Sequence, residues 1–291
     1  MRLRPLGPGA PAVSAVGYGG MHLSIAGRPP EDQGIRVIHA ALDAGVTLID
    51  TADAYCLNQH DIGHNERLIA EALGSWRGRR DGVIVATKGG LVRPDGRWDN
   101  DARPEQLRAA CHRSLLALGT DRIDLYQLHA PDPQVPFADS VGELARLRQE
   151  GKIQWVGLSN VSVAQIREAG RLVPITTVQN RLNPFFREAL SGGVVRHCAE
   201  QGIGFLAYSP TGGGRLNLKL PGHPVLAPVG AAHGVSAHAV ALAWALAQSA
   251  TVIVIPSART VEHATDSIGA ADLELTPQEL SAIDAAEFSR T

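Results

Sequence analysis

The sequence is poor in cysteine and has no run of one charge. Its three cysteines, Cys56, Cys111 and Cys198, lie far apart, and they imply neither a disulfide framework nor a Cys-x-x-Cys site. The 27 basic and 29 acidic residues give a formal net charge of −2. Because no basic run is present, we expect neither nucleic acid nor an anionic membrane as the main partner.

We also expect neither a signal peptide nor a membrane-spanning run. Prolines follow the early arginines of MRLRPLGPGAP, where a signal peptide needs an apolar core. Residues 237–256 are nearly all apolar, but they include His238, Gln248 and Ser249 and change from Ala/Leu to Val/Ile midway. This pattern predicts a buried helix followed by a buried strand. We therefore expect a cytoplasmic protein.

No stretch of low complexity and no internal repeat divides the chain. With 291 residues, 44% of them hydrophobic, the chain can bury most of its apolar surface without a metal or disulfide. The 31 glycines and 18 prolines are ordinary for a folded chain with many tight connections. We expect one domain over residues 1–291.

Short apolar runs alternate with helix-like segments along the whole chain. Parallel strands buried on both faces are typically short and continuously apolar, and helices separate them. Eight such strand–helix units in this length predict a (β/α)₈ TIM barrel. The predicted strands are residues 13–18, 46–50, 82–88, 123–129, 153–159, 175–179, 202–208 and 251–255.

A Rossmann-type fold is the alternative. Its fingerprint is a Gly-x-Gly-x-x-Gly between the first strand and helix, and Gly17-Tyr18-Gly19-Gly20-Met21 matches it poorly. For the barrel we expect the first dozen residues to form a hairpin that plugs the bottom. Residues 276–287 are expected to form an extra C-terminal helix.

Several helix boundaries are also predicted. Pro104 is a favoured first helical position, and Gly119 should end that helix. Another helix is expected over residues 138–150. Asn65 is expected to cap a helix over residues 66–73.

Polar residues stand at or just after the ends of the predicted strands. Asp50, Lys88 and His129 end three of them, and Tyr55 follows Asp50 by five residues. Each has an ordinary explanation: a solvated lysine, a capping aspartate, a loop histidine or a packed ring. Lysine is scarce, however, with only three among the 27 basic residues. A barrel brings all four residues to one mouth, where barrel enzymes work.

Such a cluster suits proton donation by tyrosine. An isolated tyrosine, with a pKa near ~10, is a poor acid at neutral pH. We expect the Lys88 ammonium to lower the pKa of Tyr55, with Asp50 orienting the lysine. His129 can hold a carbonyl oxygen near Tyr55. Protonating a developing alkoxide is half of a carbonyl reduction, and the hydride must come from a nicotinamide cofactor.

Seven short strings recur in the order and approximate spacing of a known family, and together they cover essentially the whole chain. They are Asp50-Thr51-Ala52-Asp53-Ala54-Tyr55, Ala86-Thr87-Lys88, Gln127-Leu128-His129, Gly157-Leu158-Ser159-Asn160, Val178-Gln179-Asn180, Ala207-Tyr208-Ser209-Pro210 and Ile255-Pro256-Ser257-Ala258-Arg259. On this ordered set the chain resembles the aldo-keto reductases. The resemblance implies NADPH-dependent interconversion of an aldehyde or ketone and its alcohol. It makes Tyr55 the general acid, with Asp50, Lys88 and His129 completing a catalytic tetrad.

The resemblance also implies a cofactor site. Ser159, Asn160 and Gln179 would hold the nicotinamide carboxamide, and the ring of Tyr208 would stack on the nicotinamide. The glycine-rich run after Tyr208 suits close approach to phosphate. The further cofactor residues implied are Gly19, Gly20, Met21, Ser209, Pro210, Gly212, Gly213, Gly214, Ile255, Ser257, Arg259, His263, Asp266 and Ser267.

The adenosine end departs from the family pattern. Many members have a Lys and an Arg around the 2′-phosphate, where this chain has Ser257 and His263. Arg259 is the nearest guanidinium that can grip a phosphate. Asp266 and Ser267 fall where the family binds adenine. We expect NADPH as the cofactor, with NADH as the alternative.

A longer insert follows Tyr55, where the family usually has Gly and a short loop. Its Cys56, His60 and His64, with Asp61 nearby, are spaced as metal ligands can be. Structural zinc usually needs four ligands on a rigid scaffold, and no second Cys/His pair is evident. We therefore expect no metal and a loop at the rim of the substrate pocket.

The substrate is expected to be a small aldehyde, an oxo-sugar or a natural-product carbonyl, in an open pocket. Tyr55, Trp98 and His129 are expected to contact it, and Phe185 and Phe186 are further candidates to line the pocket. The protein should be a monomer or a weak homo-oligomer. The alternative functions are a cofactor-binding regulatory subunit and, with less support, a Schiff-base lyase that uses Lys88.

Overall fold

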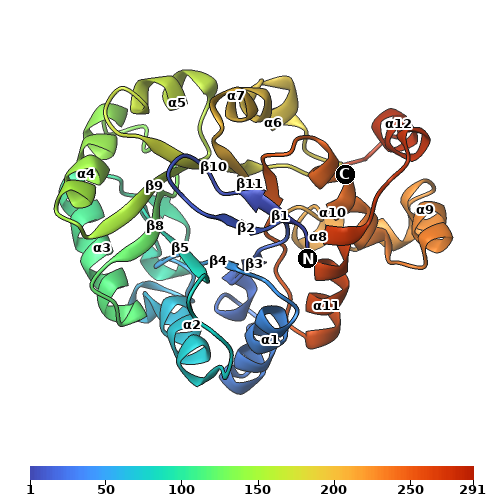
Figure 1. Ribbon diagram of the computed structural model, residues 1–291. Coiled ribbons are helices and arrows are strands. Elements are labelled where there is room, and N and C mark those ends of the chain that lie inside the picture. Colours follow the sequence, from blue (N-terminus) through green and yellow to red (C-terminus); the bar gives the residue numbers. More distant parts are fainter.

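The computed structural model describes residues 1–291 and is a barrel of eight parallel strands surrounded by helices (Figure 1). Neighbouring strands follow the order β12-β11-β10-β9-β8-β5-β4-β3, with every pair parallel. A parallel bridge between Val16 and Val254 joins the first strand to the last. The barrel strands are β3 (Tyr18–Gly19), β4 (Leu48–Asp50), β5 (Ile84–Gly89), β8 (Ile123–Leu128), β9 (Ile153–Ser159), β10 (Ile175–Arg181), β11 (Gly204–Tyr208) and β12 (Val252–Val254).

Helices separate the strands, as the alternation of the sequence predicts. Their apolar faces and the outer faces of the strands form the larger of two buried clusters. The helices are α1 (Glu31–Asp43), α2 (His64–Ser75), α3 (Pro104–Leu118), α4 (Phe137–Gln149), α5 (Val163–Ala169), α6 (Glu188–Ser191), α7 (Val194–Gln201), α8 (Gly214–Asn217), α9 (Leu226–His233), α10 (Ala237–Ala247), α11 (Val261–Gly269) and α12 (Pro277–Ala285).

The N-terminal residues plug one end of the barrel, as expected. β1 (Leu3–Pro5) and β2 (Ala12–Ser14) form an antiparallel hairpin, which lies across the barrel in dark blue in Figure 1. Leu6 and Val13 belong to a second buried cluster with inward side chains of the barrel strands. A Cβ on Gly204 would lie 2.0 Å from the Leu6 carbonyl oxygen. Only glycine therefore lets the hairpin pack this closely on β11.

Two boundary predictions are wrong. The run at residues 13–18 is divided between the hairpin strand β2 and the barrel strand β3, because the chain leaves the plug before it enters the barrel. Asn65 does not cap α2, which begins at His64 after Gly63 with φ 79°. Asn65 is buried instead, and its amide donates to the Gly20 carbonyl at 2.9 Å. This tertiary contact outweighs the local preference of asparagine for helix ends.

The helix over Pro104–Leu118 ends at Gly119 with φ 63°, as predicted. α12 begins with a capping box between Thr276 and Glu279 and confirms the extra C-terminal helix. The apolar stretch 237–256 forms the buried helix α10 followed by β12. No single helix has the length and apolar character to cross a membrane. Helices α9 and α10 reach that length and apolar character only when they are taken together, and the chain bends by 97° between them.

Candidate active site

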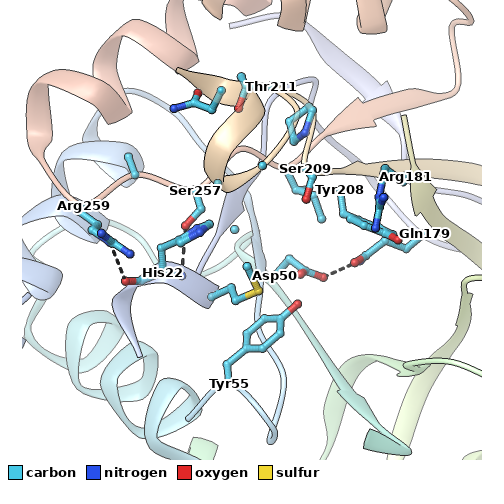
Figure 2. A pocket seen from close by; sticks show the side chains of 18 of the residues that line it. His22, Asp50, Tyr55, Gln179, Arg181, Tyr208, Ser209, Thr211, Ser257 and Arg259 are labelled. Carbon is cyan, nitrogen blue, oxygen red and sulfur yellow. Dashed lines mark hydrogen bonds between the residues drawn. The ribbon is translucent and has the colours of Figure 1, made fainter. Parts of the chain in front are cut away.

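A cavity of about 810 Å³ opens at the carboxyl ends of the strands (Figure 2). In a barrel of parallel strands these ends carry the loops that form the active site. Three of the four predicted tetrad residues, Asp50, Tyr55 and His129, line the cavity. Lys88 does not line it, because it is completely buried behind Tyr55. A lyase that forms a Schiff base on Lys88 needs an accessible amine, so this geometry disfavours that alternative.

Lys88 joins Asp50 to Tyr55. Its Nζ atom donates to Asp50 Oδ2 at 2.5 Å, to the Thr51 carbonyl at 2.9 Å and to Tyr55 Oη at 3.0 Å. These contacts use all three ammonium donors. Tyr55 Oη accepts a hydrogen bond here, so its own proton is free to donate into the cavity.

The charge states of the cluster follow from burial and from these contacts. Burial lowers the pKa of Lys88, but Asp50 and Tyr55 outweigh burial and raise it overall. Burial raises the pKa of Tyr55 above its usual value, although Lys88 acts to lower it. Lys88 therefore acts on the pKa of Tyr55 in the expected direction, but burial has the larger effect and the net shift is upward, because the phenolate loses its stabilisation by water. Tyr55 stays protonated at neutral pH.

His129 is neutral in this environment. Burial, and then the charge of Lys88, hold its pKa well below 6.5. Its ring packs edge-to-face with Tyr55, with the ring centroids 5.7 Å apart. A neutral imidazole carries one N–H donor, and both rings line the same cavity. A carbonyl oxygen in the cavity can therefore meet a phenol and an imidazole.

Two glutamine amides hold the other oxygen of Asp50. Gln179 Nε2 donates to Asp50 Oδ1 at 2.7 Å, and Gln127 Nε2 donates to the same oxygen at 3.2 Å. Gln127 was missed as a site residue. The signal was present, because Gln127 precedes His129 by two residues and side chains alternate along a strand, so both face the barrel interior.

The residues predicted to hold nicotinamide gather at the ends of β9, β10 and β11. Ser159, Asn160, Gln179 and Tyr208 all line the cavity. Asn160 has a left-handed backbone, with φ 59°, and its amide donates to the His129 carbonyl at 2.9 Å. Tyr208 Oη donates to Asn160 Oδ1 at 2.8 Å. These bonds fix the Tyr208 ring at the mouth.

The loop after β11 has an unusual backbone. Ser209, Gly212 and Gly213 have φ values of 47°, 96° and 70°, a region that favours glycine. A Cβ on Gly212 would lie 3.0 Å from Leu216 and 3.1 Å from Phe185. The cavity is lined here by Ser209, Pro210, Gly213 and Gly214.

A second polar group lies at the far end of the cavity. Arg259 is exposed there, and its Nε donates to the His22 carbonyl at 3.4 Å. Ser257 Oγ accepts from the His22 amide at 3.3 Å. Ser257, Arg259 and His263 line the cavity, together with Gly19, Met21 and Ile255. His22 also lines it and was missed, since a histidine after a short strand has no distinctive spacing.

Some predicted residues lie elsewhere. Asp266 accepts from the Ser236 hydroxyl at 2.7 Å, at the start of α10. Phe185 is buried in the core, and Phe186 packs against the core and Arg181, so neither lines the cavity. Trp98, which does line it, is edge-on to Tyr55 at 6.4 Å. The predicted cofactor residues outside the lining are Gly20, Gly212, Asp266 and Ser267.

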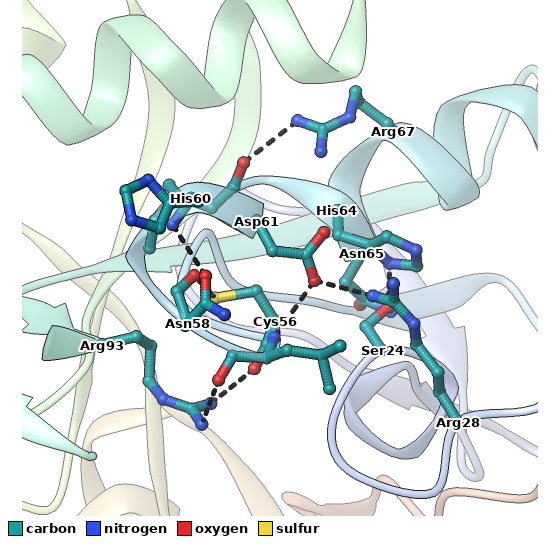
Figure 3. A network of polar contacts seen from close by, with 12 residues as sticks. Ser24, Arg28, Cys56, Asn58, His60, Asp61, His64, Asn65, Arg67 and Arg93 are labelled. Atoms are coloured by element: carbon teal, nitrogen blue, oxygen red, sulfur yellow. Dashed lines mark hydrogen bonds and ion pairs between the residues drawn. The ribbon is translucent and has the colours of Figure 1, made fainter. Parts of the chain in front are cut away.

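The insert after Tyr55 is held by protein contacts (Figure 3). Cys56 Sγ donates to the Ala54 carbonyl at 3.4 Å, and His64 Nδ1 contacts the Ser24 hydroxyl at 2.8 Å. Asp61 pairs with Arg28 at 2.6 Å. The structure contains no group of three or more His, Cys, Asp or Glu side chains that could hold a metal ion.

A pair of buried carboxyl groups lies behind the tetrad and was also missed. Burial, and then Glu66, raise the pKa of Asp53 to about 8. Glu66 accepts from Thr87, the neighbour of Lys88, at 2.5 Å. Burial raises the pKa of Glu66 as well. Arg113 approaches Asp53 only to 3.8 Å. Burial and the neighbouring Glu66 thus favour the protonated form of Asp53.

Comparisons with known proteins agree with this fold. Residues 15–287 match the model of the Aldo/keto reductase family. An uncharacterized oxidoreductase of Schizosaccharomyces pombe is 34% identical over 277 residues, which cover 94% of this chain and 86% of that protein. A probable aldo-keto reductase of Glycine max is 33% identical over 302 residues, which cover 93% of this chain and 84% of that protein.

Solved structures show the same likeness. An aldo/keto reductase of Klebsiella pneumoniae, in complex with NADP and acetate, is 26% identical with a TM-score of 0.81 and covers 98% of this chain and 95% of its own. The glycerol dehydrogenase of Gluconobacter oxydans is 28% identical with a TM-score of 0.83, and the match covers 97% of this chain and 94% of its own. Both likenesses extend over nearly the whole of each chain.

Proposed function

The chain belongs to the aldo/keto reductase family and is an NAD(P)H-dependent oxidoreductase, and from that premise we propose that it reduces an aldehyde or ketone to an alcohol with NADPH, using Tyr55 as the proton donor. One observation carries the proposal. Lys88 Nζ lies between Asp50 and the hydroxyl of Tyr55, with Tyr55 and His129 facing the cavity.

The residues present fit a nicotinamide dinucleotide. The cavity joins the tetrad to Arg259 and His263, and its volume of about 810 Å³ is within the range of ligand sites. Ser159, Asn160 and Gln179 offer hydroxyl and amide groups for the carboxamide, and Tyr208 offers a ring face. Backbone with positive φ at Ser209 and Gly213 is of the kind whose amides can converge on a phosphate.

The proposed chemistry divides between cofactor and protein. Bound NADPH supplies the hydride that reduces the carbonyl carbon. Tyr55 gives its proton to the carbonyl oxygen, and Lys88 stabilises the phenolate that remains. Asp50 balances the charge of Lys88, which keeps the ammonium in place without water. Neutral His129 donates to the carbonyl oxygen and aligns it with Tyr55.

We further propose that Arg259 grips the 2′-phosphate and favours NADPH over NADH. The family usually has a lysine in place of Ser257, so here the guanidinium is the cation available for this charge. Asp266 and Ser267 lie outside the cavity lining, about one turn beyond His263 on α11, and are proposed to contact an adenine that extends past the lining. We also propose that residues 1–291 act as one domain, as a monomer or a weak homo-oligomer on a small carbonyl substrate.

Titration with each cofactor tests the proposal. The four tryptophans should report NADPH and NADH by quenching and by energy transfer to the nicotinamide. We expect both to bind, with NADPH bound at least threefold more tightly. Turnover is then measured across a panel of small aldehydes, oxo-sugars and ketones. Absence of binding by both nucleotides would contradict the proposed function, and retained binding without any turnover would favour a regulatory subunit.

A further inference from the structure

Arg181 is a guanidinium in the cavity for which the proposed chemistry has no use. It is the last residue of β10, two positions beyond Gln179. Because side chains alternate and each residue rises about 3.3 Å, Arg181 faces the same interior as Gln179, roughly 6.6 Å nearer the mouth. It pairs in register with Tyr208 of β11, and it lines the cavity with Tyr55 and His129.

The guanidinium of Arg181 has no carboxylate or carbonyl partner. It makes no side-chain hydrogen bond or ion pair, and its central carbon lies 4.4 Å from the centroid of the Phe186 ring and 5.7 Å from that of Tyr208. Arg290 also stacks on Phe186, at 4.2 Å, but pairs with Glu188 at 2.6 Å. The two aromatic rings make cation–π contacts with the Arg181 guanidinium, and such contacts leave its N–H groups available for a ligand.

The charge inside the cavity favours an anion beside Arg181. Asp50 is the only carboxylate among the lining residues, and Lys88 pairs with it. Glu188, outside the lining, is near enough to Arg181 for the two charges to interact, but it pairs with Arg290 at 2.6 Å. Arg259 is the other guanidinium of the lining, and Figure 2 shows it on the opposite side of the cavity from Arg181. A planar guanidinium that is already ordered binds a carboxylate or phosphate through two parallel hydrogen bonds.

We propose that the carbonyl substrate carries an anionic group, a carboxylate or a phosphate, and that Arg181 binds this group at the rim while the carbonyl lies at Tyr55 and His129. This rests on the proposed reductase function. The pyrophosphate of the cofactor has the same chemistry, but its proposed loop, Ser209–Gly214, follows Tyr208 and offers its own backbone amides. Arg181 instead lies beside Gln179, on the β10 side (Figure 2).

Matched substrates and variants test the proposal. The substrates are 3- and 4-carboxybenzaldehyde and their methyl esters, which keep the reacting carbonyl and remove the charge. Arg181→Met removes the guanidinium. Arg181→Lys keeps the positive charge but cannot form the two parallel hydrogen bonds of a guanidinium. Arg171→Met is the control, because Arg171 is also exposed, makes no side-chain hydrogen bond or ion pair, and is outside the cavity lining.

For the wild-type protein we expect kcat/KM to be larger for at least one acid than for its ester. In Arg181→Met that acid should lose about 10- to 100-fold in kcat/KM, the range of a charge-assisted hydrogen bond, while the ester changes less than threefold. Arg181→Lys should recover part of the loss. The Kd of NADPH should stay within about threefold of wild type.

Three results would overturn the proposal: equal losses for acid and ester, no preference for any acid in the wild-type protein, or a tenfold weaker Kd for NADPH in Arg181→Met. The last would assign the guanidinium to the cofactor.

A separate binding measurement does not need turnover. Calorimetry with 4-hydroxymethylbenzoate and its methyl ester, in the presence of NADP⁺, should show tighter binding of the acid that is lost in Arg181→Met. If no aldehyde is reduced but this difference is found, the proposed function fails and the anion site stands.

Discussion

The floor of the cavity, formed by the tetrad Asp50, Tyr55, Lys88 and His129, has buried polar side chains that lie on strands or on the loops that follow them. Its far end, formed by Ser257, Arg259 and His263, has half-buried or exposed side chains that come from a loop and from the start of α11. Asp50 and Lys88 are 2% and 0% exposed, and each has several hydrogen-bond partners. The Arg259 guanidinium is exposed and makes one long hydrogen bond, to the His22 carbonyl. The floor is therefore arranged before any ligand binds, which suits chemistry that depends on fixed charges. The far end keeps free hydrogen-bonding groups, which suits recognition of a ligand.

Removal of Lys88 from the floor of the cavity should have the largest effect on both stability and turnover. Lys88→Met leaves Asp50 as a buried carboxylate without a counter-ion, which typically costs about 3–5 kcal/mol of unfolding free energy. Turnover should also fall by about 10²–10⁴, the usual value of assisted proton transfer. Denaturant unfolding and steady-state kinetics measure the two effects.

The double variant Asp50→Asn with Lys88→Met separates stability from activity. It removes both charges, so most of the stability should return while turnover stays low. Lys152→Met is the control, because the Lys152 side chain makes no hydrogen bond or ion pair. A Lys88→Met protein whose free energy of unfolding lies within about 1 kcal/mol of the wild-type value would contradict the view that the pair of Asp50 and Lys88 stabilises this part of the fold.

Removing Arg259 should change the far end alone. In Arg259→Met we expect the Kd of NADPH to rise about 10- to 100-fold, since a charge-assisted contact to phosphate is lost. The Kd of NADH and the kcat at saturating cofactor should stay within about threefold. Fluorescence titration and kinetics test this, with Arg171→Met as the matched control. Equal weakening of both nucleotides would show that the guanidinium does not recognise the 2′-phosphate.

The buried pair behind Lys88 should give stability a dependence on pH. The pKa of Asp53 is about 8 in the folded protein and 3.8 for an ordinary aspartate. Between these values the folded state binds the extra proton, so this group favours folding at low pH and its contribution is lost as pH rises through 8. The slope is at most about 1.4 kcal/mol per pH unit.

Asp53→Asn mimics the protonated carboxyl and should flatten this decline. The free energy of unfolding is measured at several values between pH 5 and 8 for the variant and wild type. Asp81→Asn serves as the control, because Asp81 is fully at the surface. If the slopes of wild type and Asp53→Asn are identical, Asp53 is already ionised in the folded protein.

The sequence predicted the floor better than the far end, and the reason is physical. Strands such as Ile153–Ser159 are short, mostly apolar runs whose ends are defined by the residues themselves, and the barrel then determines where their polar ends meet. Asp50, Tyr55, Lys88 and His129 could therefore be grouped before any coordinates were known. The hairpin plug and the helix Pro104–Leu118 were predictable for the same reason, because proline, glycine and apolar spacing act locally.

What could not be predicted depends on contacts between distant segments. The burial that raises the pKa of Tyr55, the role of Asn65 inside the core and the buried pair Asp53 and Glu66 all depend on how helices pack on strands. His22 reaches the far end only because the turn after β3 lies beside Ser257. Arg181 is an unremarkable arginine in the sequence, and only the barrel shows that it lacks a partner inside the cavity.

The central claim is that Tyr55 donates the proton in a reduction that uses NADPH. The most direct test compares wild type with Tyr55→Phe, first by fluorescence titration with NADPH and then by turnover of whichever carbonyl the wild type reduces best. Tyr126→Phe, a buried tyrosine outside the cavity lining, is the control. We predict an unchanged Kd for NADPH and a loss of turnover of about 10²–10⁴-fold in Tyr55→Phe alone. A Tyr55→Phe protein that turns over within about threefold of wild type would contradict the account.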